Sequence, residues 1–420
     1  MHFSTEAVPA EIPVLMRRLF LITGWRPWKR RLTWLEEQVR VHPTISFYLS
    51  ERFGLELALE QLRQHKIQSG RYLWPPETAE QQRFYSFLAM VARCHHRLSP
   101  AGKTRLKGML EDALKSDQGL ASLAFEMKIA AHFMTRGFDV IFHDMDEGGR
   151  FDYLIENKGV EMEVECKFVS GDIGRQIHLK RFHQLGTILL PETANFLDQG
   201  CGGRLIRILI PGRLGGDNKQ HQEIRRLMLR AISDKDWNAN LNGYEVSISE
   251  FSIADSPFAR LPPEEISTDR IQRFLSDKFE IDNKNLLINF SPIKGAVLVV
   301  VESAKKDAVL KGIHHQLKNA ARNQFSGDRP SIICCELADL TENQLRGLWN
   351  ERTGLQFMVN KLMERRLQIH TVAFTTPGTV RIKNTRSETS FYTSIQETGP
   401  AYTFTNPSHP LADDPRYDVF

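Results

Sequence analysis

The sequence predicts an α/β protein in which a mixed sheet flanked by helices follows an all-helical N-terminal domain. Apolar residues recur at helical spacing through the first 110 residues, and helix and strand patterns alternate from residue 119 onward. A strand, helix, strand order over 296–335 predicts a C-terminal βαβ extension. With 420 residues, 41% of them hydrophobic and 25% charged, the chain has the composition of a globular protein with two or three cores.

The predicted helical domain is basic. Residues 1–118 hold 18 Lys and Arg and 12 Asp and Glu, a net charge of +6, whereas the remainder carries −2 of the whole-chain +4. We therefore expect a basic helical domain over 1–110, an α/β core over 111–240, an α/β region over 241–385 that extends the core sheet, and a tail over 386–420. The first of these is a candidate surface for nucleic acid, a protein partner or a second copy of the chain.

The N-terminal helices are expected between turn-forming residues. A cluster within them interleaves Arg26, Lys29, Arg30 and Arg31 with Trp25, Trp28 and Trp34. Such a cluster either grips phosphates and stacks bases, or is a solvated helix face with its tryptophans in the core. The expected helices are 12–21, 32–41, 44–62 and 81–93.

The α/β part is expected to begin with a helix that ends at Gly137, because glycine suits the left-handed helix terminus. Ser170-Gly171-Asp172 is expected to cap a later helix through residue 190. The predicted order is helix 120–136, strand 138–142, a strand pair 151–155 and 160–168 around a turn at 156–159, helix 172–190 and strand 204–210.

The following region has weaker patterns and one sharp one. Residues 296–301 and 331–335 are buried-type apolar strands with a helix between them, the arrangement of a parallel pair joined by a right-handed crossover. After residue 385 the chain is rich in Ser, Thr and Pro, which predicts a surface-hugging or mobile tail. The other expected elements are strand 244–253, helix 268–279, helix 341–366 and strand 369–374.

Several classes of protein are excluded by composition. The longest apolar run, 296–301, is far shorter than the roughly 20 residues that cross a bilayer, and no basic start precedes a secretory-type cleavage site. The five cysteines form no CxxC pair, and no Gly-rich motif would cradle a nucleotide phosphate. We expect a cytoplasmic protein with no membrane partner, no disulfide framework and no structural zinc.

The strongest chemical signal is a run of carboxylates on one strand. Val160 to Phe168 alternates apolar residues with Glu161, Glu163, Glu165 and Lys167, so the charged side chains share one face. If the hairpin loop spans 157–160, Asp152 stands opposite Glu165; a two-residue loop would instead place it opposite Glu163. In either register two carboxylates lie about 5 Å apart, close enough to share a hard cation.

These residues resemble the signature of the PD-(D/E)XK nuclease superfamily, which has the restriction-endonuclease-like fold. Asp152 matches the aspartate at the start of one hairpin strand, and Glu165-Cys166-Lys167 matches the Glu-x-Lys of the next. Glu126 lies on the preceding helix, where many members carry an acidic residue. The order helix, strand, hairpin, helix, strand over 119–210 is also that of the superfamily, although Phe151 stands where its name has proline.

The resemblance implies a Mg²⁺ or Mn²⁺ site. Asp152, Glu165 and the main-chain carbonyl of Cys166 would hold the ion, and Lys167 would orient or deprotonate the attacking water. Glu126 either joins the metal or forms a structural salt bridge, and the Cys166 thiol points into the core. Glu163 would stand behind the metal ligands or lie at the surface.

The resemblance also implies a nucleic-acid substrate. Gln176 occupies the place of a catalytic or substrate-contacting glutamine, and Arg175, Lys180 and Arg181 either meet the phosphate backbone or form a solvated face. We expect a Mg²⁺-dependent DNA endonuclease, in the company of bacterial antiviral defence nucleases. The alternatives are a catalytically inactive nucleic-acid or protein-binding module and an RNA-cleaving effector.

Overall fold

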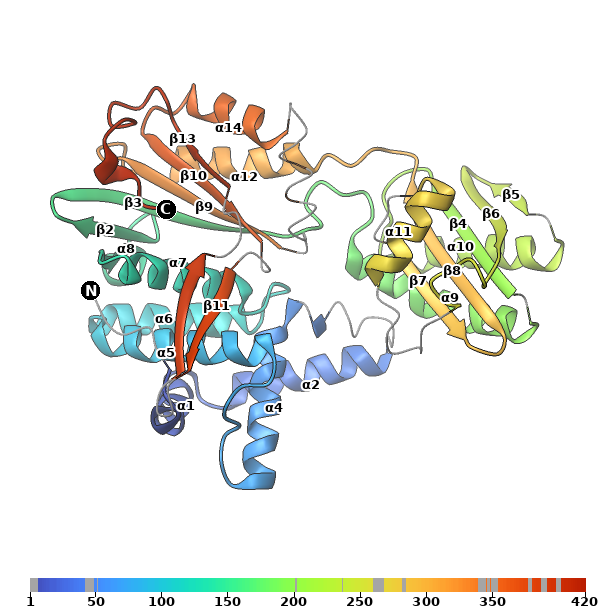
Figure 1. Ribbon diagram of the computed structural model, residues 1–420, viewed down its shortest axis with the longest axis horizontal. Helices are drawn as coiled ribbons and strands as arrows, with labels where there is room; N and C mark the ends of the chain where they lie inside the picture. Colours follow the sequence, from blue (N-terminus) through green and yellow to red (C-terminus); the bar gives the residue numbers. More distant parts are fainter. Residues whose placement is uncertain are drawn as a thin grey trace. The chain divides into compact units, whose positions relative to one another are not determined.

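The computed structural model divides the chain into two compact units (Figure 1). Unit 1 comprises Met1–Glu36, Leu49–Ile173 and Val309–Phe420, and unit 2 comprises Glu37–Tyr48 and Gly174–Ala308. The expected boundaries at residues 110, 240 and 385 do not coincide with this division. The structure describes residues 7–41, 49–50, 52–200, 202–235, 237–259, 268–281, 285–338, 345, 348, 354–376, 380–386, 391–397 and 402–420.

Unit 1 is built around a six-stranded mixed sheet with the order β1-β2-β3-β9-β10-β13. The first three strands are antiparallel to one another, β3, β9 and β10 run parallel, and β13 closes the edge antiparallel to β10. The strands are β1 Asp139–Phe142, β2 Tyr153–Asn157, β3 Val160–Val169, β9 Ser331–Leu337, β10 Ile369–Thr375 and β13 Tyr402–Thr405.

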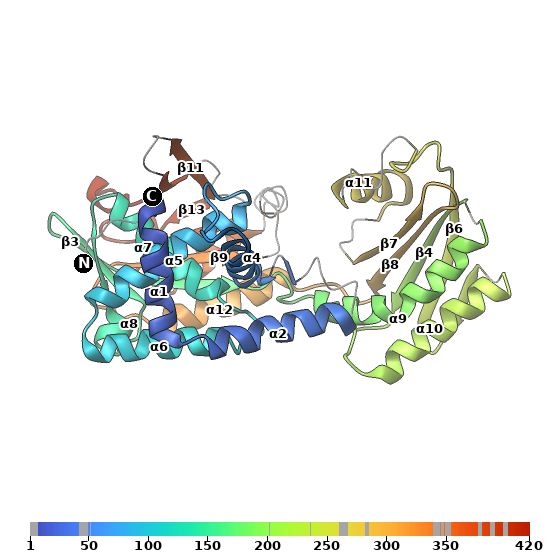
Figure 2. The same cartoon turned by 90° about the horizontal axis from the view of Figure 1, so that it is seen from below.

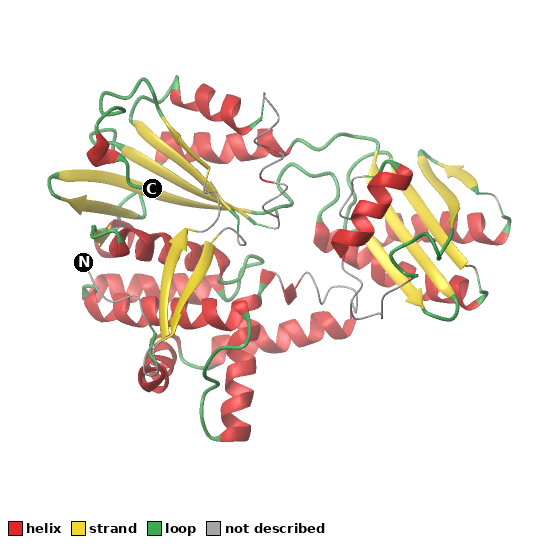
Figure 3. Ribbon diagram, in the orientation of Figure 1, coloured by secondary structure: helices red, strands yellow, loops and turns green. Residues whose placement is uncertain are grey.

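The N-terminal helices and α7 cover one face of this sheet (Figure 3). Their apolar side chains form one continuous core with the strands: Trp28 and Phe84 belong to the same cluster as Phe133, Tyr153 and Val164. The helical segment is therefore part of unit 1 and has no separate core of its own. These helices are α1 Ile12–Thr23, α2 Arg26–Val41, α4 Gly54–Ser69, α5 Ala79–Arg97, α6 Pro100–Ala113, α7 Ala121–Thr135 and the short α8 His143–Asp146, with a 3₁₀ turn at Pro9–Glu11.

The opposite face of the sheet is also covered. Helices α12, Val309–Asn323, and α14, Leu355–Met363, pack there and form a second core with alternate residues of the strands, among them Val169, Ile333 and Val372. The β3–α12–β9 and β9–α14–β10 segments are the two parallel connections of the sheet. Both faces of β3 are consequently buried along most of its length.

The C-terminal region contributes to unit 1. β13 supplies the edge strand, and Val419 is buried in the core under α7, where the Phe420 ring lies 5.6 Å from His132. Residues 402–420 are therefore part of unit 1 and not a separate tail, and most of their side chains lie at its surface, which agrees with the surface-hugging alternative of the expectation. A two-stranded ladder joins β11, Val380–Arg386, to β12, Phe391–Glu397, and a 3₁₀ turn spans Pro415–Tyr417.

Unit 2 is a five-stranded mixed sheet with the order β5-β6-β4-β8-β7. Helices α9 and α10 cover one face and α11 covers the other (Figure 2). The elements are α9 Leu179–Asp198, β4 Gly202–Ile210, α10 Asn218–Ser233, β5 Asn238–Leu241, β6 Tyr244–Phe251, α11 Thr268–Phe279, β7 Leu286–Ser291 and β8 Gly295–Ser303.

The observed strands and helices differ from several of the expected elements. The strands predicted at 296–301 and 331–335 exist, as β8 and β9, but they lie in different sheets and are not a parallel pair. The strand predicted at 204–210 belongs to unit 2, so the strand that follows the hairpin in the sheet of unit 1 is β9 and not β4. The helix expected from residue 172 begins at Leu179, and the 341–366 helix is described chiefly as α14, since most of 339–353 lies outside the described residues.

Among the described residues, none of the helices combines the length and the apolar character needed to span a membrane. The cysteines that the structure describes, Cys94, Cys166, Cys334 and Cys335, are free and buried.

Candidate active site

The candidate site is assembled on the β2–β3 hairpin, whose register is fixed by a tight turn. Lys158 and Gly159 both have positive φ, 48° and 82°, as a two-residue type I′ turn requires. Glu156 pairs with Glu161 and Tyr153 with Val164. Continued by one residue, this register places Asp152 opposite Glu165, which is one of the two predicted pairings. The turn that produces it has only two residues, for which the pairing with Glu163 was expected, so the predicted link between loop length and register is wrong.

Asp152 is attached directly to the neighbouring strand. The main-chain N–H of Cys166 donates to Asp152 Oδ2 at 2.6 Å, and the Asp152 carbonyl accepts from the N–H of His143 at 3.0 Å. The Cys166 thiol points to the opposite face of β3, into the core beside the Tyr153 hydroxyl at 2.9 Å. Burial raises the thiol pKa well above its ordinary value, so Cys166 has only its main chain to offer at this site.

Glu165 and Lys167 form an ion pair on the other face of β3. Lys167 Nζ donates to Glu165 Oε1. Glu165 is only 2% exposed, and its second oxygen, Oε2, has no hydrogen-bond partner within the described part of the chain. A buried carboxylate oxygen without a donor is costly, so this atom is suited to a ligand that the chain itself does not supply.

Two further carboxylates lie close enough to Glu165 to interact with it electrostatically. Glu126 comes from α7, as expected, and Asp144 comes from α8, immediately after β1. Asp144 was not anticipated from the sequence, and its Oδ1 is likewise buried without a partner among the described residues. We refer to Glu126, Asp144, Asp152 and Glu165 as the acidic cluster.

Burial and mutual repulsion shift the acid–base behaviour of the acidic cluster. Burial, then the charge of Asp152, raises the pKa of Glu165 to about 8 and that of Asp144 to about 7. Burial raises the pKa of Asp152 to about 6, against the stabilising hydrogen bond from Cys166. The pKa of Glu126 lies well above its ordinary value because of burial, followed by the charges of Asp152, Asp144 and Glu165.

Lys167 is the cation of this site. Burial alone would lower its pKa, but the adjacent Glu165 carboxylate more than offsets that effect and the pKa is raised. The neighbouring cation on α7, Lys128, is engaged elsewhere: its Nζ lies 2.7 Å from Glu336 Oε2 on β9. The four carboxylates are offset by Lys167 and, at Asp144, by the charge of Arg105, which leaves an excess of acidic groups.

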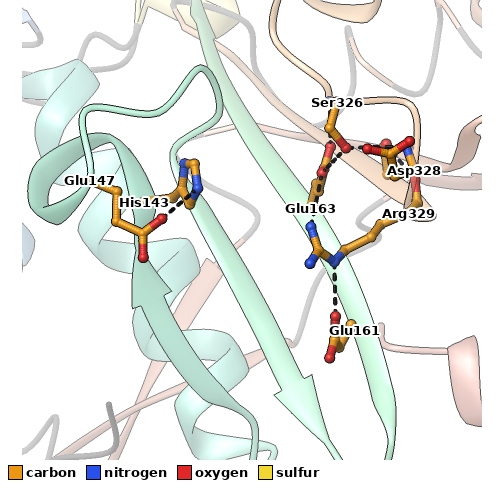
Figure 4. Close-up of polar contacts among 8 residues, drawn as sticks. His143, Glu147, Glu161, Glu163, Ser326, Asp328 and Arg329 are labelled. Atoms are coloured by element: carbon orange, nitrogen blue, oxygen red, sulfur yellow. Dashed lines mark hydrogen bonds and ion pairs between the residues drawn. The ribbon is translucent and has the colours of Figure 1, made fainter.

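Glu163, two residues before Glu165, is used differently (Figure 4). It is fully buried and accepts hydrogen bonds from the main-chain N–H of Ser326, at 2.9 Å, and from the Ser326 hydroxyl. Arg329 lies 3.7 Å from it and pairs with the exposed Glu161 at 2.8 Å. Glu163 thus anchors the segment before β9, and the face expected to be open for chemistry is largely closed by that segment and by α12.

Figure 4 also shows His143 and Glu147, which lie in and just after α8, beside the hairpin. His143 Nε2 lies 2.9 Å from Glu147, and the His143 ring stacks on Phe151 with centroids 4.2 Å apart. These contacts hold α8, and with it Asp144, against the start of β2.

Gln176 belongs to unit 2, whereas the acidic cluster belongs to unit 1. It precedes α9, so the expectation that it lies on a helix is wrong. Its main-chain N–H donates to Asp307 at 2.7 Å and its side-chain amide to the Lys306 carbonyl at 3.4 Å. The structure gives it a role in the loop connections of unit 2.

The cluster of basic and aromatic residues at the start of α2 is divided between core and surface. Trp28 is completely buried and donates to Thr23 at 2.8 Å, and Arg31 is 5% exposed with its guanidinium over the rings of Trp34 and Phe53. Those side chains have a structural role. Arg26, Lys29 and Arg30 are exposed on the same helix.

In the described part of the chain, no group of three or more His, Cys, Asp or Glu side chains stands in an arrangement that could hold a metal ion. Glu165 and Asp152 are instead held by Lys167 and by the main-chain N–H of Cys166. The chain matches no protein-family model, no curated protein and no solved structure.

Proposed function

We propose that the protein is a metal-dependent nuclease that hydrolyses phosphodiester bonds, with DNA as the substrate. The observation that carries the proposal is the acidic cluster beside Lys167, in which Glu165 keeps a buried oxygen without a partner in the described structure. Four clustered carboxylates with raised pKa values are destabilising unless a cation offsets them.

The topology of unit 1 supports a restriction-endonuclease-like core. Setting unit 2 aside, the chain runs α7, β1, the β2–β3 hairpin, α12 and β9, with β9 parallel to β3. This is the order helix, strand, hairpin, helix, strand that accompanies the motif. In this interpretation Gly174–Ala308 is an insertion between the hairpin and the second helix.

The donor set suits Mg²⁺ or Mn²⁺, which prefer oxygen ligands. Asp152, Glu165 and the carbonyl of Cys166 would hold the ion, with Glu126 and Asp144 as additional carboxylates. A bound divalent ion would supply an activated water and neutralise charge on the phosphate. The Lys167–Glu165 ion pair occupies part of this donor set in the structure, so Lys167 would have to move aside as the ion binds.

The residues of the chain itself have defined tasks in this proposal. The Cys166 N–H fixes Asp152 Oδ2, and Oδ1 of the same carboxylate would bind the ion. Lys167 Nζ, released from Glu165, would donate to the attacking water or to a phosphate oxygen and offset the developing negative charge. We propose the same cellular setting that the motif implies, a cytoplasmic nuclease in bacterial antiviral defence.

The test is cleavage of supercoiled plasmid DNA by purified protein with and without Mg²⁺ or Mn²⁺. Wild type should nick the plasmid only with metal, and D152N and K167A should lose at least about 100-fold of the rate, the scale of one transition-state contact. E161Q is the matched control, because Glu161 lies on the same strand face but is exposed and pairs with Arg329. Equal cleavage by wild type, D152N and K167A would refute the assigned site.

A non-catalytic binding module is the second candidate. It is favoured by one observation: Asp152 and Glu165 already have protein partners, the Cys166 N–H and the Lys167 ammonium, in place of a metal ion. This candidate predicts no heat of Mg²⁺ or Mn²⁺ binding in calorimetry and no cleavage of either nucleic acid. The RNA-cleaving alternative is separated from the leading proposal by giving the same preparation DNA and RNA of equal length.

A further inference from the structure

Unit 2 gathers cations at one edge of its sheet. β4 and β8 run parallel and end level with each other, with Ile210 beside Ser303, so the loops that follow them leave from the same edge. The N–H of Ala304 donates to the carbonyl of Ile210 at 2.8 Å, and the Ser303 hydroxyl donates to the carbonyl of Gly212 at 2.8 Å. Carboxyl ends of parallel strands are where open α/β sheets bind ligands.

Residues 174–176, where the chain enters unit 2, are hydrogen-bonded to the loops at the same edge of the sheet. The N–H of Leu214 donates to the Gln176 carbonyl at 3.0 Å, and the N–H of Ala308 donates to the Gly174 carbonyl at 2.8 Å. Three stretches far apart in sequence are therefore hydrogen-bonded together. The basic side chains that they and the start of α9 carry are Arg175, Lys180, Arg181, Arg213, Lys305 and Lys306, which we call the basic edge.

Contacts between the segments bring several of these side chains together. Arg213 Nη2 lies 2.8 Å from His178 Nε2, at the position that caps α9. Arg181 lies across Gly216, where a Cβ would come within 2.1 Å of its Nη1. Lys305 passes over Gly212, where a Cβ would lie 3.8 Å from its Cδ. Gly216 therefore leaves room for Arg181, whereas at Gly212 a Cβ would make only an ordinary contact with Lys305.

Acidic groups near the basic edge are already used. Asp307 accepts from the Gln176 N–H at 2.7 Å and lies 3.7 Å from Arg175, and Asp217 caps α10 by accepting from the Lys219 N–H at 2.6 Å. Arg213, Lys305 and Lys306 are exposed, and none of them has an acidic partner among the described residues. Their positive charge is left for a ligand.

The amino end of α9 adds to the positive potential of the basic edge. Lys180 and Arg181 lie in the first turn of α9, which contains no acidic residue. The amino end of a helix carries partial positive charge, so cations there repel it and an anion would relieve the repulsion. A surface that only needed to be solvated would gain stability from acidic residues in that turn.

We propose that the basic edge of unit 2 binds the phosphate backbone of duplex DNA. The inference rests on the proposed nuclease function and deepens it, by assigning substrate binding to a unit that holds none of the acidic cluster. Six cations from separate segments match a row of phosphates better than a single phosphate group, for which one compact pocket would suffice.

The test is fluorescence anisotropy of the full-length chain with a labelled DNA duplex of about 30 base pairs, in EDTA so that no metal-dependent cleavage occurs. R213E/K305E/K306E should weaken binding by at least about tenfold. The slope of log Kd against log salt concentration should decrease by about two to three, because each lost phosphate contact lowers that slope by roughly 0.9.

The matched control is R226E/K235E/K278E, which makes the same charge change at one exposed arginine and two exposed lysines of unit 2 that lie outside the basic edge and have no acidic partner among the described residues. Its affinity should stay within about twofold of wild type. Thermal melting of both triple variants checks folding; reversal of exposed charges that have no acidic partner should not lower the melting temperature of R213E/K305E/K306E.

Three results would overturn the inference: no binding of the duplex by wild type, equal weakening by both triple variants, or an unchanged salt dependence in R213E/K305E/K306E. The readout is independent of catalysis. Duplex binding that depends on the basic edge, together with no cleavage in Mg²⁺, would refute the nuclease proposal and leave this inference standing as a DNA-binding surface.

Discussion

At the scale of single residues, Glu163 and Glu165 show how two glutamates with the same orientation on β3 acquire different roles. Glu163 accepts two hydrogen bonds from Ser326, whereas Glu165 has one partner, Lys167, and one buried oxygen without any in the described structure. Both are almost completely buried. The two glutamates differ because the segment before β9 supplies hydrogen-bond donors to Glu163, whereas Lys167 of β3 itself is the partner of Glu165.

This contrast predicts opposite effects of two equivalent substitutions. E163Q should lower the free energy of unfolding by about 1–3 kcal/mol, because it disturbs buried hydrogen bonds, and leave Mg²⁺ affinity unchanged. E165Q should abolish Mg²⁺ binding while costing less stability, because it removes one of several repelling carboxylates. Urea unfolding and titration calorimetry of both variants provide the measurement; loss of Mg²⁺ binding in E163Q alone would contradict the assignment.

The acidic cluster also predicts the pH dependence of metal binding. Because the pKa values of Glu165, Asp144 and Asp152 are raised to about 8, 7 and 6, these groups hold protons near neutral pH that an incoming cation must displace. Mg²⁺ affinity should therefore rise from pH 6 to pH 8, and binding should release protons. Calorimetry in two buffers of different ionisation enthalpy measures that release, and an affinity independent of pH would contradict the prediction.

The sequence was sufficient for part of this site. Period-two alternation placed Glu165 and Lys167 on one face, and the hairpin placed Asp152 opposite either Glu165 or Glu163, because both are local properties of a hairpin. Asp144 was missed since it lies outside any periodic element, in the short α8 after β1. The acidic run Asp144, Asp146 and Glu147 directly after a predicted strand was the available signal.

At the scale of elements, the strands were largely found but their partners were not. The apolar runs of β8 and β9 are both of the buried type, and such a run does not encode which sheet it joins. The interpretation as one crossover failed because α12 follows a change of unit at residue 308. The helix expected from residue 172 began late because 170–178 forms hydrogen-bonded turns before α9.

Packing between helices predicts a further pH effect. Glu56 on α4 is 1% exposed and accepts from the N–H of Leu120 at 3.1 Å, at the start of α7. Burial raises its pKa to about 7, even with the charge of Arg31 nearby. The folded state therefore holds a proton that the unfolded state releases above its ordinary pKa, so this contribution to stability is present at low pH and is lost as pH rises toward 7.

E56Q should remove the loss of folding stability that Glu56 causes as the pH rises. A shift of this size corresponds to about 3 kcal/mol, so E56Q should be more stable than wild type at pH 8 by up to that amount and differ little at pH 4.5. The glutamine oxygen can still accept from Leu120. Thermal melts from pH 4.5 to 8 measure the difference; a constant gap between the two proteins across that range would contradict the raised pKa.

At the scale of the whole molecule, the two units differ in how they are made from the chain. Unit 1 is discontinuous, with β3 before and β9 after unit 2 as neighbouring parallel strands of one sheet. Unit 2 is essentially the continuous stretch Gly174–Ala308, and the hydrogen bond between Ala308 and Gly174 brings its two ends together. An insertion whose ends meet can be removed without stretching the host fold.

The last prediction follows from that arrangement. Replacing Gly174–Ala308 with a short Gly-Ser linker should leave a protein that unfolds in one cooperative transition, because Ile173 and Val309 both pack against the α12 core of unit 1. This protein should bind Mg²⁺ as the full chain does, since the acidic cluster lies entirely in unit 1, and should lose affinity for duplex DNA along with the basic edge. Circular dichroism melting, calorimetry and anisotropy measure the three properties.

Two outcomes would contradict this prediction. A non-cooperative melt would show that β3 and β9 need unit 2 to pair. Retained DNA affinity would place the binding surface in unit 1, where the exposed Arg26, Lys29 and Arg30 of α2 are the next candidates.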